Sequence, residues 1–168
     1  MSLGYRCASI DQKGFAYIRV HVESKSGIGS LEYKVDSGAS RTTINIEALL
    51  RLGYTKEWVK NNGTLLTDGD KPLLANNMPI EDCYIVTLPG TYFGGYRSEF
   101  WKPLVLLHDS YQFRLLLGVD IMRYFLWQFD YAESLCYFKL NEKMVNQTYS
   151  SPEESSIGSL MYHDACIT

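Results

Sequence analysis

The sequence has 168 residues, of which 46% are apolar and 13 are tyrosines, and its formal net charge is −3 at pH 7. That length suits one compact domain, and the composition favours a β-rich globular protein over a disordered one. The mild charge excludes a strongly basic surface for nucleic acid, and no cluster of basic residues points to an anionic membrane surface.

The longest apolar runs, at 104–107 and 115–119, are too short to span a bilayer, and the first residues lack the basic-then-apolar plan of a signal peptide. We therefore expect a cytoplasmic protein that binds no membrane. The cysteines form no CxxC pair, and no histidine stands at ligand spacing from them. We expect reduced thiols, no metal and no cofactor. The residues in question are Cys7, Cys83, Cys136, Cys166, His21, His108 and His163.

The first predicted elements are two strands, Phe15–Val22 and Leu31–Val35, joined as a hairpin by a turn that contains two glycines. Two short helices should follow. Ile46–Leu52 has helical spacing with Asn45 as N-cap and Gly53 as a stop, and Lys56–Asn61 is capped by Thr55.

The middle of the chain predicts a projecting hairpin, in which Thr64–Thr67 leads to a turn at Asp68-Gly69-Asp70 and Pro72–Ala75 returns. Further strands are expected at Cys83–Leu88 and Pro103–Leu107, with a glycine-rich turn between them. All-β character dominates this part of the chain.

The last predicted elements are an apolar strand at Leu115–Leu117, a short helix at Asp120–Phe125 and a terminal hairpin of Leu126–Asp130 with Leu135–Leu140. Residues 1–14 are interpreted as an N-terminal extension and 15–140 as the domain. The serine-rich composition of residues 141–168 predicts a mobile tail. A further hypothesis is that this tail is a processing segment or a tether.

One segment carries the chemistry. Asp36 stands where the second predicted strand ends, in the run Asp36-Ser37-Gly38-Ala39-Ser40. Sites are often built at such strand ends. Here Gly38 allows close backbone approach and strained dihedrals, Ser37 can brace the loop, and Ser40 can bond near the carboxylate.

This run resembles the active-site loop of the retropepsin-like aspartic proteases, which reads Asp-Ser/Thr-Gly-Ala followed by Ser/Thr. The family's second motif, an apolar pair before glycine, is matched by Leu116-Leu117-Gly118 in the expected order. The resemblance spans roughly residues 15–140. It implies a mostly β, retropepsin-like barrel or folded sheet with one to three short helices, one lobe per chain.

The resemblance also has departures. Asp120 stands near the place where retroviral members carry an arginine that braces the dimer. The hairpin at 65–75 occupies the place of the family's flap but lacks its glycine-rich tip. Its candidate flap residues are Thr67, Asp68, Gly69 and Asp70. A competing flap is the glycine-rich turn Thr91–Tyr96.

Peptide hydrolysis without a metal or a covalent nucleophile needs a base to activate water and an acid for the carbonyl oxygen or amine. Two carboxylates about 4 Å apart repel by about 4 kcal/mol at an effective dielectric of ~20, so they share one proton and supply both roles. Only Asp36 lies in such a motif. The sequence therefore predicts a homodimeric aspartic endopeptidase acting on polypeptides, with one Asp36 from each chain.

Other readings remain open. Asp109, Asp120 and Asp130 are alternative second carboxylates, although capping explains each more simply. The serines lack the G-x-S-x-G elbow of hydrolases, so serine catalysis is disfavoured. The alternative to an enzyme is a non-catalytic peptide-binding or dimerisation module that retains the retropepsin fold.

Overall fold

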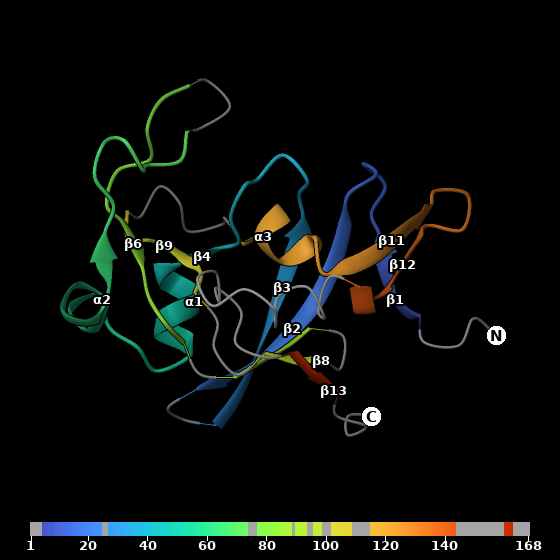
Figure 1. Cartoon of the computed structure of the whole chain (residues 1–168), viewed down its shortest axis with the longest axis horizontal. Coiled ribbons are helices and arrows are strands. Elements are labelled where there is room, and N and C mark those ends of the chain that lie inside the picture. Colours follow the sequence, from blue (N-terminus) through green and yellow to red (C-terminus); the bar gives the residue numbers. More distant parts are fainter. Residues whose placement is uncertain are drawn as a thin grey trace.

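The computed structural model describes residues 5–24, 27–73, 77–88, 90–93, 96–98, 102–108, 115–143 and 160–162 (Figure 1). Its spine is the long antiparallel pair of β2 (Ala16–Ser24) and β3 (Gly27–Val35). In β2 buried residues alternate with more exposed ones, as a strand with one face on the core requires. The predicted hairpin is thus confirmed and is longer than the sequence pattern indicated.

A nine-stranded curled sheet is built around this pair, with strand order β11-β12-β1-β2-β7-β8-β13 and with β3 and β10 attached through β2. β10 runs parallel to β3, which brings two segments about 80 residues apart in the chain side by side. The remaining strands of this sheet are β1 (Arg6–Ile10), β7 (Thr91–Phe93), β8 (Tyr96–Ser98), β10 (Leu116–Leu117), β11 (Phe125–Asp130), β12 (Leu135–Leu140) and β13 (Leu160–Tyr162).

A second sheet of four strands has the order β4-β9-β6-β5. Its neighbours in Figure 1 are the two helices predicted from their caps. Asn45 accepts a hydrogen bond from the Ala48 amide, and Thr55 accepts one from the Trp58 amide. The elements are β4 (Thr43–Asn45), α1 (Ile46–Arg51), α2 (Lys56–Asn62), β5 (Thr64–Leu65), β6 (Cys83–Ile85) and β9 (Leu104–Leu106).

The main core fills the space between the two sheets and α1. Tyr33, Leu49, Phe93 and Leu117 are each at most 1% exposed. The core therefore reaches from the long hairpin to the strand that precedes Gly118. The short helix α3 (Val119–Met122) follows directly and ends earlier than the predicted helix.

Two ends of the predicted domain differ from the structure. β1 lies in the supposed N-terminal extension, yet it pairs with both β12 and β2. β13 lies in the supposed tail and pairs with β8. Polar, serine-rich composition, on which the predicted tail boundary rests, does not exclude backbone pairing of a short segment such as Leu160–Tyr162. Within the described residues, no helix is long and apolar enough to cross a membrane.

The predicted return of the projecting hairpin is wrong. β5 pairs with β6 and not with Pro72–Ala75. Leu73 makes one isolated bridge to Pro79, and residues 74 and 75 lie outside the described residues. The reason is that proline cannot donate a ladder hydrogen bond, whereas β6 gains burial against β9. A long loop, residues 66–82, therefore separates the two strands.

Candidate active site

The Asp36 loop is held from below by β10. The Asp36 amide donates to the Leu117 carbonyl at 3.0 Å, and the Lys34 amide donates to the Leu115 carbonyl at 3.0 Å. These bonds continue the parallel pairing of Leu117 with Val35. The two sequence motifs, Asp-Ser-Gly-Ala-Ser and Leu-Leu-Gly, are thus brought together as predicted.

Inside the loop, the Asp36 carboxylate is oriented by its own backbone. Oδ1 of Asp36 accepts a hydrogen bond from the Gly38 amide at 2.9 Å, and the Ala39 amide donates to the Asp36 carbonyl at 3.1 Å. Gly38 serves by its lack of a side chain, because a Cβ there would lie 3.2 Å from Asp36 Oδ1. The strained dihedral predicted for Gly38 is not found, since its φ is not positive.

The two predicted serine contacts are not formed among the described residues. Ser37 and Ser40 are exposed, and their hydroxyls make no hydrogen bond to the described residues. The loop is instead closed by backbone bonds, which a sequence pattern does not specify.

Gly118 is the contact point between the loop and α3. A Cβ at Gly118 would lie 2.4 Å from the Arg41 carbonyl carbon and 2.8 Å from the Ala39 oxygen. The Val119 amide donates to that same Ala39 oxygen at 2.8 Å. Glycine is required because backbone, which cannot swing aside as a side chain does, occupies the space.

A buried threonine and an aspartate complete this support. Thr42, which is 0% exposed, donates its hydroxyl and its amide to Asp120 Oδ1, both at 2.8 Å. The same hydroxyl accepts a hydrogen bond from the Gly118 amide at 3.1 Å. Asp120 therefore ties α3 to the loop, and it is not among the residues that line the cavity beside Asp36.

Sequence reasoning missed this role because Thr42 follows the motif without being part of it.

Burial, followed by the nearby Asp120 charge, raises the pKa of Tyr33 well above 10.0. Asp130 accepts from the Glu133 amide at 3.1 Å, which agrees with its predicted capping role. Asp109 lies outside the described residues.

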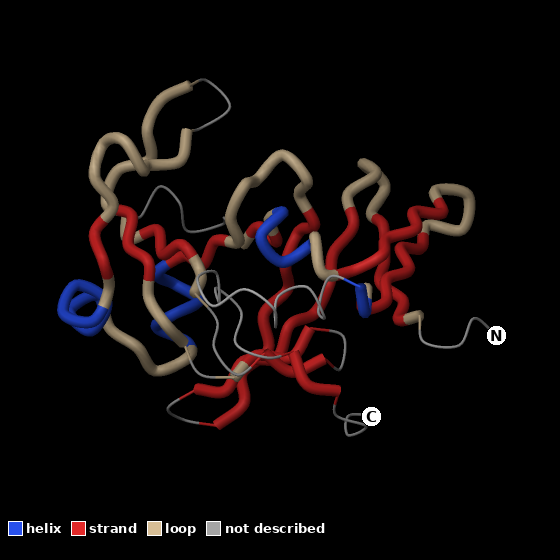
Figure 2. The backbone as a smooth tube through the Cα atoms, in the orientation of Figure 1, coloured by secondary structure: helices blue, strands red, loops and turns tan. Residues whose placement is uncertain are grey.

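The Asp36 loop lies on the same side of the molecule as residues 66–73 and 77–82, the described parts of the long loop (Figures 1 and 2). Between them is a cavity of about 460 Å³. The Asp36 loop lines one side with five residues: Asp36, Gly38, Ala39, Ser40 and Arg41. Asp36 is the one carboxylate among the described residues that line it.

The facing wall is mostly apolar and comes from the long loop, whose lining residues are Pro72, Leu73, Asn77 and Ile80. These lining residues lie C-terminal to the candidate flap residues Thr67, Asp68, Gly69 and Asp70, none of which lines the cavity. The competing flap at Thr91–Tyr96 contributes none of the described lining residues. Its strands β7 and β8 belong to the large sheet.

No group of three or more histidine, cysteine, aspartate or glutamate side chains in the described part of the chain could hold a metal ion. The charged side chains among the described lining residues of the cavity are those of Asp36 and Arg41.

Comparison with known proteins agrees with this architecture. Neither a protein-family model nor a curated protein matches the sequence. The structure is similar to the crystal structure of a retropepsin-like aspartic protease from Rickettsia conorii, with a TM-score of 0.53 and 21% identity. The likeness covers 81% of this chain and 99% of that chain. The chain has the retropepsin-like fold.

This fold gives the site its layout. In this protein, Asp36 directly follows β3, which pairs in parallel with β10, and β10 leads into α3. The resemblance expected from two short motifs thus extends to the arrangement of the strands.

Proposed function

We propose that the chain is an aspartic endopeptidase that acts as a homodimer, in which two Asp36 carboxylates share one proton. The observation that carries the proposal is the placement of Asp36, which is fixed at the end of β3, oriented by Gly38, and open to a cavity walled by the 66–82 loop.

The second chain follows from the chemistry. One carboxylate must accept a proton from water while another donates a hydrogen bond to the scissile carbonyl. No other described carboxylate lines the cavity, so a second copy must bring the second one. The exposed Ser37 hydroxyl is available to that copy.

In this mechanism the ionised Asp36 takes a proton from a water molecule, and the oxygen of that water attacks the carbon of the peptide carbonyl. The protonated Asp36 of the other chain transfers its proton to the carbonyl oxygen, giving a neutral tetrahedral diol. When the diol collapses, the C–N bond breaks and the first Asp36 gives its proton to the leaving amine. The other Asp36 takes the proton of a diol hydroxyl, so the pair again holds one proton.

The substrate we propose is an extended polypeptide lying between the Asp36 loop and the 66–82 loop. Its backbone can pair with exposed strand-like segments, and apolar side chains suit the wall formed by Leu73 and Ile80. A cytoplasmic location is also proposed, supported by the free thiols of Cys7, Cys83 and Cys136.

The test is peptide-library cleavage by wild type and by Asp36→Asn. The substitution keeps the shape and removes the charge, and we expect cleavage to fall by at least about 10³-fold because the base is lost. The control is Glu142→Gln, an exposed carboxylate far along the chain, which should cleave like wild type. Cleavage by Asp36→Asn at the wild-type rate would contradict the proposal. Binding without cleavage by wild type would favour the non-catalytic peptide-binding module.

A further inference from the structure

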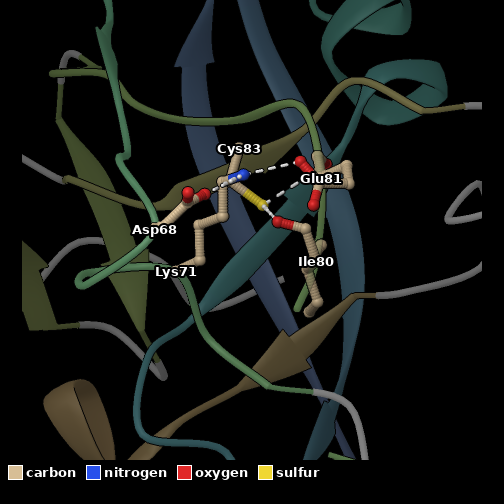
Figure 3. Close-up of polar contacts among 5 residues, drawn as sticks. All are labelled: Asp68, Lys71, Ile80, Glu81 and Cys83. Atoms are coloured by element: carbon tan, nitrogen blue, oxygen red, sulfur yellow. Dashed lines mark hydrogen bonds and ion pairs between the residues drawn. The ribbon is translucent and has the colours of Figure 1, made fainter. Parts of the chain in front are cut away.

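The legs of the 66–82 loop are joined by one lysine. Lys71 Nζ lies 2.9 Å from Asp68 Oδ1 on the outgoing leg and 2.6 Å from Glu81 Oε2 on the returning leg (Figure 3). The two carboxylates come from positions 13 residues apart, so the ammonium group adds a side-chain contact between the legs to the isolated bridge of Leu73 with Pro79.

A single surface ion pair contributes about 0–1 kcal/mol, and here one lysine with a mostly covered side chain meets two carboxylates. The Lys71 side chain is 11% exposed, whereas the side chains of Asp68 and Glu81 are 99% and 60% exposed. Hydrogen bonds to Glu81, and then to Asp68, raise the pKa of Lys71. Most of the Lys71 side chain is thus covered by the loop, and its ammonium group meets both carboxylates where they are exposed.

Other bonds fix the same base of the loop to the second sheet. The Ile80 amide donates to the Pro72 carbonyl at 3.0 Å. The Cys83 thiol donates to the Ile80 carbonyl at 3.2 Å (Figure 3). Ile80 and Cys83 are buried with Leu104 and Leu106 of β9. Buried contacts therefore hold the base of the loop against the second sheet, and the Lys71 contact lies beside them.

Three of the four loop residues that line the cavity with Asp36 lie next to this contact. Pro72 and Leu73 follow Lys71 directly, and Ile80 directly precedes Glu81. All three line the cavity. We propose that Lys71 is a positioning residue that ties the two legs of the 66–82 loop and so holds the apolar wall of the cavity over Asp36. Its effect on cleavage rests on the proposed function, whereas its effect on the loop does not.

The experiment compares Lys71→Met, which keeps the length of the stem and removes the charge, with Lys71→Arg. Amide hydrogen exchange at Ile80 reports the loop, and exchange at Leu52 of the α1 C-terminus reports the rest of the fold. In Lys71→Met we expect Ile80 to exchange at least about tenfold faster with Leu52 unchanged, and KM for cleaved peptides to rise more than kcat falls. Lys71→Arg should restore most of both. The control is Lys60→Met, an exposed lysine of α2, which should change neither.

Glu81→Gln provides a second route if Lys71→Met folds poorly, because it weakens the 2.6 Å contact and leaves the lysine in place. We expect the same selective gain in Ile80 exchange. Unchanged Ile80 exchange in the folded variants would overturn the proposal. If wild type cleaves no peptide but Ile80 exchange rises as expected, the proposed function fails and the tie between the loop legs stands.

Discussion

Asp120 and Thr42 are 78 residues apart in the sequence, yet Asp120 Oδ1 accepts both the hydroxyl and the amide of Thr42 at 2.8 Å. The Thr42 hydroxyl in turn accepts a hydrogen bond from the Gly118 amide. One carboxylate therefore links α3, the Leu-Leu-Gly motif and the end of the Asp36 loop. The loop that orients Asp36 depends on this link as well as on its own turn.

The first prediction concerns Asp120→Ala. Hydrogen bonds to a charged group contribute about 1.5–3 kcal/mol each, and Thr42 is left buried without its acceptor. We expect the free energy of unfolding to fall by about 2–4 kcal/mol. Asp120→Asn, which retains an acceptor oxygen, should cost much less. Denaturant unfolding measures both, and a Thr42→Val/Asp120→Ala cycle that is fully additive would contradict the link.

The second prediction tests the close approach at Gly118. An added Cβ meets backbone atoms of Arg41 and Ala39 within 2.8 Å, so the loop or α3 must move. We expect Gly118→Ala to lower the free energy of unfolding by about 1–3 kcal/mol or more and to abolish cleavage. Gly69→Ala is the matched control, because nothing lies within 4 Å of its Cβ position. Equal stability of the two variants would show that the loop yields freely.

The third prediction concerns Arg41, an exposed cation that lines the cavity and makes no ion pair with the described residues. An acidic substrate side chain near it gains on the order of 1 kcal/mol, which is about fivefold in kcat/KM. We expect Arg41→Glu to shift the cleavage profile from acidic towards basic neighbours of the scissile bond. Arg51→Glu, on the exposed side of α1, should leave the profile unchanged.

The fourth prediction is a loss of stability in alkali. Burial raises the pKa of the Cys83 and Cys136 thiols from 9.0 to about 11. A raised folded-state pKa means that stability is complete below pH 9 and is lost as pH rises towards 11. Each thiol should account for about 2–3 kcal/mol of that loss, since one pKa unit is about 1.4 kcal/mol. Unfolding measured between pH 8 and pH 11 should show the fall.

The matched variants separate these thiols from other groups. Replacing Cys83 and Cys136 by alanine should flatten the alkaline fall, whereas Cys7→Ser, at an exposed thiol, should leave it as it is. A fall of equal depth in the double alanine variant would assign it elsewhere. Tyr33, whose pKa burial also raises, adds a loss at still higher pH.

The predictable part of this fold is the part written in local chemistry. Asn45 and Thr55 cap the helices they were expected to cap, and Gly53 adopts a φ of 82° after α1. The two short motifs also gave the Asp36 site, because each marks a strand end. Three features could not be predicted because they depend on residues far apart in the sequence. They are the pairing of β5 with β6, the hydrogen bonds of Thr42 to Asp120, and the part of the 66–82 loop that faces the cavity.

The central claim is that each working site contains Asp36 from two chains, and mixing tests it most directly. Wild type is incubated with increasing amounts of inactive Asp36→Asn, and cleavage is expressed per wild-type chain. With a ninefold excess of the variant and random pairing, we predict a fall to about one tenth, because most wild-type chains then pair with a variant. Unchanged cleavage per wild-type chain would contradict the claim, since it would mean that one chain carries the whole site.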